Sequence, residues 1–154
     1  MSAEQVLERT QRIELPIEAT FDLFGDAFNL ERITPPWLGF RVVTPRPIEM
    51  GQGTLLEYRL RLHGVPVRWK TRIAVWEPPL RFVDEQISGP YALWHHTHTF
   101  EVDGEATLIT DRVRYRIGFG PLGALALALF VRRDVERIFD YRREAMPELI
   151  AESA

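Results

Sequence analysis

The feature that most constrains the fold is a two-residue alternation of apolar and charged side chains. In residues 54–62, leucines and a tyrosine occupy the even positions, whereas a glutamate and two arginines occupy odd positions. A helix would scatter this pattern around its circumference, whereas a strand turns successive side chains to opposite faces. The segment therefore predicts a β-strand with one dry face and one wet face.

The same alternation continues as far as residue 117. The further predicted strands span residues 67–75, 81–88, 91–102 and 109–117. Residues typical of turns separate them, and Asp103-Gly104 is the strongest hairpin signal. If these two residues form the turn, His96 stands directly opposite Asp111. The pattern predicts an antiparallel sheet of at least five strands.

The two ends of the chain predict a strand, two short helices and one long helix. Residues 7–15 form a candidate first strand, and short helical pieces follow at 18–24 and 30–33. A long helix is expected from Pro121 to about Met146, where the following proline should end it. Because an apolar sheet face and an apolar helix stripe must cover each other, the expected fold class is α+β. About six or seven antiparallel strands would curve around the long C-terminal helix.

Composition limits the classes of protein that the chain can belong to. Its 154 residues, of which 45% are apolar and 27% charged, predict one globular domain over residues 1–154. The absence of cysteine excludes disulfides, zinc–thiolate sites and cysteine nucleophiles. A net charge of −3 argues against binding to nucleic acid through its phosphates.

Two further observations bear on location. The N-terminus lacks the apolar core of a signal peptide. The apolar stretch from Ile117 to Val131 is shorter than the ~20 residues that span a bilayer. We therefore expect a cytoplasmic protein without stable membrane insertion.

Several motifs resemble those of one known superfamily. They read Thr34-Pro35-Pro36-Trp37-Leu38, Trp76-Glu77-Pro78-Pro79, Phe82-Val83-Asp84-Glu85-Gln86 and Gly89-Pro90-Tyr91, the last followed by Trp94, His96, His98 and Phe100. Together with the order of elements, they resemble the START-like or SRPBCC superfamily, which includes birch-pollen-allergen-like proteins and polyketide cyclases. The resemblance is to its uncharacterised bacterial ligand-binding branch. It implies a helix-grip fold with a cavity for hydrophobic ligands between the sheet and the helix.

Polar side chains interrupt the dry face at several positions. They are Tyr58, Thr71, Asp84, Gln86, His96, His98, Asp111 and Tyr115. A three-residue loop at 89–91 would pair Asp84 with His96, so the sequence predicts a row of Asp84, His96 and Asp111. An imidazole between two carboxylates is oriented or held charged by them, and a buried carboxylate without such a partner is costly.

Three interpretations of this row stay open. It can be a hydrogen-bonded network that braces the sheet, a polar anchor at the base of a ligand cavity, or a metal or acid–base site. A metal would take His96 and His98 with Asp84 or Asp111 as an oxygen ligand. A His-x-His pair on a strand is a weak signal by itself, and we expect no metal or cofactor.

The dry face also carries large aromatic residues, and an arginine faces it from the helix. The aromatic residues are Tyr58, Trp69, Trp94, Phe100 and Tyr115. Arg142 lies on the apolar stripe of the predicted helix. From there its head group can reach a carboxylate such as Asp84 or Asp111, or an anionic group of a ligand.

We therefore expect the protein to bind a small hydrophobic molecule, lipid-like, polyketide-like or aromatic, between the sheet and the helix. The expected ligand-binding residues are Tyr58, Trp69, Thr71, Asp84, Gln86, Trp94, His96, His98, Asp111, Tyr115 and Arg142. The alternative is a cyclase or dehydratase that uses His96 with Asp84 or Asp111 as catalytic residues. A third possibility is an interaction domain whose partner docks on the apolar start of the long helix.

Two other surfaces are open to interpretation. The wet face carries a row of basic residues, Arg59, Arg61, Arg68, Lys70, Arg72, Arg112, Arg114 and Arg116. We interpret it as a solvated face that neighbouring glutamates neutralise in part, with no nucleic-acid partner. The stretch from Leu122 to Phe130 is apolar all round, and it is expected to be a cavity lid, a homodimer contact or a patch that touches membranes.

Overall fold

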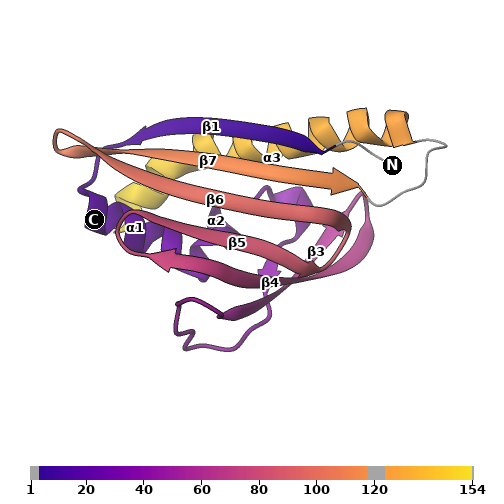
Figure 1. Ribbon diagram of the computed structural model, residues 1–154, viewed down its shortest axis with the longest axis horizontal. Coiled ribbons are helices and arrows are strands. Elements are labelled where there is room, and N and C mark those ends of the chain that lie inside the picture. Colours follow the sequence, from indigo (N-terminus) through magenta and orange to yellow (C-terminus); the bar gives the residue numbers. More distant parts are fainter. Residues whose placement is uncertain (1–3, 118–123, 154) are drawn as a thin grey trace.

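A seven-stranded antiparallel sheet curves around one long helix (Figure 1). The computed structural model describes residues 4–117 and 124–153. The strands are β1 (Gln5–Ile13), β2 (Arg41–Val42), β3 (Leu55–Leu62), β4 (Val65–Glu77), β5 (Arg81–Ser88), β6 (Tyr91–Asp103) and β7 (Ala106–Ile117). The helices are α1 (Ile17–Gly25), α2 (Leu30–Ile33) and α3 (Ala124–Ser153), with short 3-10 turns η1 (Ala27–Asn29) and η2 (Pro36–Leu38). This is the helix-grip fold that the sequence predicts.

The sheet order is β1-β7-β6-β5-β4-β3-β2. The helices lie behind the sheet in the view of Figure 1, with α3 running along its length, α1 near one end and α2 nearer the middle. The face toward the helices is the dry face, because Leu56, Tyr58 and Leu60 of β3 are buried there while Arg59 and Arg61 are exposed on the other side. The predicted strand alternation is therefore confirmed.

The register of the β6–β7 hairpin differs from the prediction by two residues. Asp103 pairs with Ala106, so the two loop residues are Gly104 and Glu105, not Asp103 and Gly104. Gly104 adopts a φ of 61°, in the left-handed region that glycine tolerates without strain, and this fixes the turn one residue later. Each residue keeps its face because the shift is even.

The shift changes which residues of β6 and β7 stand opposite each other. His98 pairs with Asp111, and His96 pairs with Val113. The predicted pairing of His96 with Asp111 is therefore wrong, although the two still contact each other diagonally. The predicted pairing of Asp84 with His96 across β5 and β6 is confirmed.

A bulge in β4 changes which of its side chains face inward. Ile73 pairs with Asp84, whereas Trp76 pairs with Phe82. Since Phe82 and Asp84 lie on the same face of β5, Ile73 and Trp76 also share a face, and the irregularity before Val75 absorbs the extra residue. Val75, which the alternation predicts on the inner face, lies on the other one.

The long helix continues through the proline that was expected to end it. Pro147 lies inside α3, and residues beyond it are still helical. A proline has no N–H for the carbonyl four residues earlier, but Gln11 Nε2 donates to that Arg143 carbonyl at 3.2 Å. Leu149 is only 2% exposed, so its burial stabilises the last turns. The predicted start at Pro121 lies outside the described residues.

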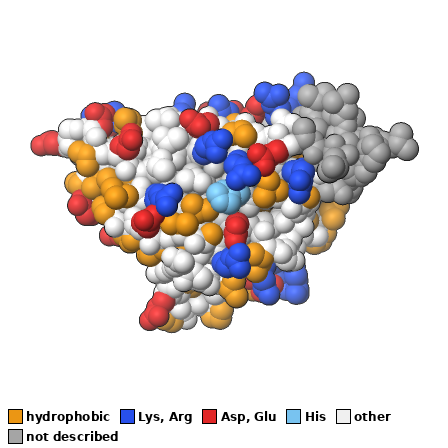
Figure 2. Space-filling model, in the orientation of Figure 1, with side chains coloured by type: hydrophobic (Ala, Val, Ile, Leu, Met, Phe, Trp, Pro, Cys, Tyr) orange, Lys and Arg blue, Asp and Glu red, His pale blue; other side chains and the backbone are white. Residues whose placement is uncertain are grey.

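The outer face of the sheet is charged but balanced. Arg114 pairs with Glu4 at 3.0 Å, and Arg112 lies 3.6 Å from Glu8. Figure 2 shows acidic and basic side chains interspersed over the face in view. This mixture agrees with a solvated surface.

No helix among residues 4–117 and 124–153 is both long and apolar enough to cross a membrane. In the apolar stretch from Leu122 to Phe130, the structure describes the side chain of Phe130 alone. Phe130 itself is about half exposed and lies beside His63, with their ring centres 4.5 Å apart. The expectations of a lid, a homodimer contact or a membrane patch stay predictions.

Candidate functional site

A cavity of about 130 Å³ lies between the inner face of the sheet and α3. Its lining residues come from strands β3 to β6, from α2 and the segment between α2 and β2, and from α3. They are Leu30, Thr34, Leu38, Phe40, Tyr58, Leu60, Leu62, Trp69, Asp84, Tyr91, Trp94, His96, His98, Ile138, Phe139 and Arg142. Apolar and aromatic side chains dominate, and the polar groups gather at one end.

Those polar groups form a cluster of two imidazoles and two carboxylates. His96 Nε2 hydrogen-bonds Asp111 Oδ1 at 2.8 Å, and His98 Nε2 hydrogen-bonds Asp84 Oδ2 at 2.6 Å. Two longer contacts close the ring: His98 Nδ1 lies 3.0 Å from Asp111 Oδ1, and His96 Nδ1 lies 3.8 Å from Asp84 Oδ2. Each histidine thus lies between the same two carboxylates. The predicted row of Asp84, His96 and Asp111 exists, with His98 as its fourth member.

Neighbouring strands bring the cluster together. His96 and His98 are two residues apart on β6 and so share a face, while Asp84 stands opposite His96 on β5 and Asp111 stands opposite His98 on β7. The two imidazole rings stack, with their centres 3.7 Å apart. Phe82 stacks on the other side of His98 at 4.0 Å, so the rings have little freedom to turn.

Burial and charge act in opposite directions on the carboxylates. Desolvation alone would raise the pKa of Asp84, but the charges of His96 and Arg142 and the contacts with His98 outweigh it and lower that pKa below its usual value. The pKa of Asp111 is lowered further. Burial again opposes the shift, and the charge of Arg142 together with both imidazoles overcomes it. Both carboxylates are therefore ionised at neutral pH.

The two histidines are shifted in opposite directions. Burial lowers the pKa of His96, and the neighbouring His98 lowers it further, so the two carboxylates only partly offset the fall. Burial would also lower the pKa of His98, but its contacts with Asp111 and Asp84 outweigh that effect and raise it. Because stacked imidazoles repel each other when both are charged, a positive charge on the pair is favoured on His98 over His96.

Arg142 of α3 completes the cluster. It is 8% exposed, and its Nη2 lies 3.9 Å from Asp111 Oδ1. The buried Nε and Nη2 atoms have no hydrogen-bond partner among the described residues. The predicted reach from Arg142 to Asp111 is confirmed, but the guanidinium keeps two unused donors.

Not all of the expected ligand-binding residues line the cavity. Those that do are Tyr58, Trp69, Asp84, Trp94, His96, His98 and Arg142. Thr71 instead hydrogen-bonds the hydroxyl of Tyr58. Burial raises the pKa of that hydroxyl. Asp111 lies behind the two histidines.

Gln86 and Tyr115 are also structural. Gln86 bonds across its own hairpin, donating to the Tyr91 carbonyl at 2.7 Å and accepting from the Tyr91 N–H at 3.1 Å. Tyr115 is 2% exposed and packs against Trp94 within the core. A strand pattern assigns a side chain to a face but does not show which part of the face is hollow.

The sequence analysis missed the residues that cover the cavity. Leu30, Thr34, Leu38 and Phe40 come from the segment around α2 and η2, and Ile138 and Phe139 come from α3. The apolar stripe of the helix signals the last two. No periodic pattern marks the other four, because they lie in or beside two short helical turns that prolines separate.

The other two histidines, His63 and His95, do not line the cavity. His63 hydrogen-bonds Asp134 through its Nε2 at 2.7 Å and is exposed. His95 projects from the opposite face of β6, next to the exposed charges. They therefore provide internal comparisons for the buried pair.

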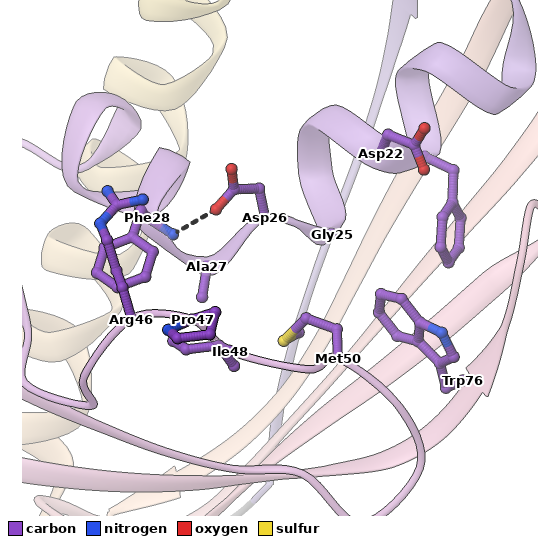
Figure 3. A pocket seen from close by; sticks show the side chains of 11 residues that line it. Asp22, Gly25, Asp26, Ala27, Phe28, Arg46, Pro47, Ile48, Met50 and Trp76 are labelled. Carbon is purple, nitrogen blue, oxygen red and sulfur yellow. Dashed lines mark hydrogen bonds between the residues drawn. The ribbon is translucent and has the colours of Figure 1, made fainter.

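A second, larger pocket of about 570 Å³ lies between α1, η1 and the segment before β3 (Figure 3). Two of its polar groups already have partners. Asp26 accepts the Phe28 N–H at 3.0 Å, and the Arg46 guanidinium lies 3.6 Å from the centre of the Phe28 ring. The smaller inner cavity, with buried and incompletely paired polar groups, is therefore the better candidate for a functional site.

The cluster also has the composition of a metal-binding site. One donor atom from each of Asp84, His96 and His98 lies within 4.8 Å of the other two. Two imidazoles and a carboxylate form a ligand set that zinc and other divalent transition metals accept.

Comparisons with known proteins agree with the fold. The model of a family described as polyketide cyclase / dehydrase and lipid transport matches residues 13–140. The crystal structure of the Zhui aromatase/cyclase from Streptomyces sp. R1128 is similar with a TM-score of 0.77 and 16% identity, over 99% of this chain and 97% of that one. TTHA0849 from Thermus thermophilus is similar with a TM-score of 0.73 and 20% identity, over 97% of this chain and 100% of that one.

Ara h 8.0201 shares the fold at a TM-score of 0.66 and 13% identity, over 97% of this chain and 99% of that one. No curated protein matches the chain in sequence. At these identities the solved structures show the fold alone, so the chemistry must be argued from the cavity itself.

Proposed function

Since the chain belongs to the polyketide cyclase / dehydrase and lipid transport family, we propose that it binds a small, mainly apolar molecule with an oxygen-bearing head group in the cavity beneath α3. The body of the ligand would pack against side chains such as Leu60, Trp69, Trp94 and Phe139. The head group would lie at the polar end, against Arg142.

The observation that carries this proposal is the pair of unused donors on Arg142. Buried N–H groups without partners are costly, and native proteins rarely leave them so. Nε and Nη2 lie on the same side of a guanidinium and bind two oxygens of one carboxylate in parallel. The cavity therefore suits an organic acid better than an alcohol or a hydrocarbon.

The volume of the cavity limits the ligand. An apolar cavity of about 150 Å³ holds a benzene-sized molecule, whereas sites for larger ligands usually enclose roughly 300 Å³ or more. At about 130 Å³, this cavity fits a single ring, and larger ligands require α3 or the segment around η2 to move outward.

A matched pair of ligands tests the proposal. Phenylacetate and 2-phenylethanol have the same ring and differ in the head group, so calorimetric titration of both isolates the contribution of the carboxylate. We expect the acid to bind about 10- to 100-fold more tightly, because hydrogen bonds to charged groups contribute about 1.5–3 kcal/mol. Arg142→Lys, which removes the two-pronged contact but keeps the charge, should abolish most of this preference.

Arg133→Lys is the control, because Arg133 is an exposed arginine of the same helix. Equal affinity of the wild-type protein for the two ligands, or an undiminished preference in Arg142→Lys, would contradict the proposal. Native mass spectrometry of protein purified from cells should also detect a co-purified small acid.

A cyclase or dehydratase activity is the second candidate, and the position of His96 favours it. Its Nε2 is held by Asp111, while its Nδ1 has no closer charged contact than Asp84 at 3.8 Å. An imidazole oriented in this way can take a proton from the carbon next to a carbonyl group, leaving an enolate. Deuterium exchange into the methylene of phenylacetone, followed by NMR, should then be accelerated by the wild-type protein and not by His96→Gln. Equal exchange rates with and without protein would exclude this activity for aryl ketones.

A further inference from the structure

Three possible metal-ligand atoms converge at the polar end of the cavity. Asp84 Oδ2 lies 2.6 Å from His98 Nε2 and 3.8 Å from His96 Nδ1. Zinc bonds of about 2.0–2.1 Å in a tetrahedral arrangement separate neighbouring donor atoms by about 3.3 Å. Side-chain movements of less than about 1 Å would bring the three atoms to that spacing.

The outward nitrogens of both imidazoles are directed at a single carboxylate oxygen. His96 Nε2 bonds Asp111 Oδ1 at 2.8 Å, and His98 Nδ1 lies 3.0 Å from the same atom, although its angle falls outside hydrogen-bond geometry. A carboxylate behind a histidine holds the N–H on the outer nitrogen and leaves the lone pair on the inner one. His96 Nδ1 would then present its lone pair toward Asp84, whereas His98 Nε2 donates a hydrogen bond to Asp84 Oδ2 at 2.6 Å.

The hydrogen bond between His98 and Asp84 uses only two of the three atoms. His96 Nδ1 lies 3.8 Å from the same Asp84 oxygen, too far for a hydrogen bond. A divalent cation that replaced the proton between His98 and Asp84 would bind all three atoms at once.

The positions of the four residues separate them into ligands and support. Asp84, His96 and His98 line the cavity, whereas Asp111 does not. The side chains of the two histidines are only 6% and 3% exposed, so they are already desolvated and held by the rings of Phe82 and Phe139. A cation among the three would keep a free coordination position toward the cavity.

From these contacts we propose that Asp84, His96 and His98 bind a divalent transition metal such as Zn²⁺, with Asp111 as a positioning residue that orients both imidazoles. The proposal does not depend on the proposed ligand, because a metal can bind whether or not the cavity takes an organic acid. It does exclude the use of His96 Nδ1 as a base in the metal-bound protein, since the metal occupies the same lone pair.

The direct test is titration of untagged, chelator-treated protein with Zn²⁺ by calorimetry and with Co²⁺ by visible spectroscopy. We expect one equivalent to bind at micromolar or lower concentration, with the intense d–d absorption of a four-coordinate Co²⁺ site. The melting temperature of the wild-type protein should rise with added Zn²⁺.

Substitutions assign the ligands. Asp84→Asn and His96→Gln should each abolish the Co²⁺ spectrum, whereas Asp111→Asn should keep it and weaken binding by about 10- to 100-fold. His95→Gln is the matched control, because His95 precedes His96 on β6 but faces the opposite side of the sheet. Circular dichroism checks that each variant is folded.

Failure of the wild-type protein to bind one equivalent of either metal would overturn the proposal, and this result requires no variant. Binding that survives in Asp84→Asn and His96→Gln, or that is lost in His95→Gln, would also overturn it. A loss of the acid preference described above would leave the metal site standing, so the two proposals fail separately.

Discussion

The two faces of the sheet each carry an arginine–carboxylate pair at nearly the same separation. On the outer face, Arg112 lies 3.6 Å from Glu8, and their side chains are 51% and 58% exposed. On the inner face, Arg142 lies 3.9 Å from Asp111, and their side chains are 10% and 11% exposed. Because water screens the first pair and not the second, similar distances should have very different energetic consequences.

The comparison also distinguishes what the charges do. The outer pairs keep the sheet surface solvated and can exchange partners at little cost. The inner charges have lost their hydration and depend on one another, so removal of one leaves its neighbours unpaired. Buried polar groups of this kind contribute to stability only while the cluster is complete.

The largest effect is expected from Asp111→Ala. This change leaves Arg142 and both imidazoles without their shared carboxylate, and we expect the free energy of unfolding to fall by about 3–5 kcal/mol. Urea denaturation at neutral pH measures it. Asp111→Asn, which keeps the shape and loses the charge, should be less damaging, and a loss below about 1 kcal/mol for Asp111→Ala would remove the distinction between the two faces.

Arg142→Met should have a smaller effect, a loss of about 1 kcal/mol. Asp111 keeps both histidines as partners, the methionine fills most of the volume, and two buried unpaired donors disappear. The same denaturation experiment measures the change. If Arg142→Met were as destabilising as Asp111→Ala, the guanidinium, and not the two imidazoles, would be the main group that stabilises the buried charge of Asp111.

Glu8→Gln should have the smallest effect. The outer pair is exposed and screened, so we expect a loss of about 0.5 kcal/mol or less, which disappears in 1 M salt at a Debye length of about 3 Å. Denaturation curves at low and high salt test this directly. A salt-independent loss above about 1 kcal/mol would show that the outer face contributes more than its exposure suggests.

Most of the fold could be predicted because strand alternation is a local property. The side chains of β3, β6 and β7 were assigned to the correct faces, and the grouping of Asp84, His96 and Asp111 followed from it. The predicted β6–β7 register was wrong because the sequence fits two turns, one with Asp103 and Gly104 in the loop and one with Gly104 and Glu105. Only the backbone shows that the second turn forms.

The errors elsewhere arise from contacts that are distant in sequence. Pro147 ends an isolated helix, but here Gln11, far away in the chain, takes over the Arg143 carbonyl. Likewise, the boundary between cavity and packed core depends on which side chains cover the sheet. For that reason Gln86 and Tyr115 share the inner face with His98 but do not reach the cavity.

The contacts near Pro147 also determine how the interior can open. Gln11 binds the Arg143 carbonyl, and Arg143 Nη2 donates to the Thr10 carbonyl at 2.6 Å, so β1 holds α3 from two directions close to its C-terminal end. The hydrogen bond between His63 and Asp134 holds α3 at a second point, nearer Ala124. A tilt of α3 about the first point would therefore have to break this second bond, and the end of the helix nearest Ala124 would then travel furthest.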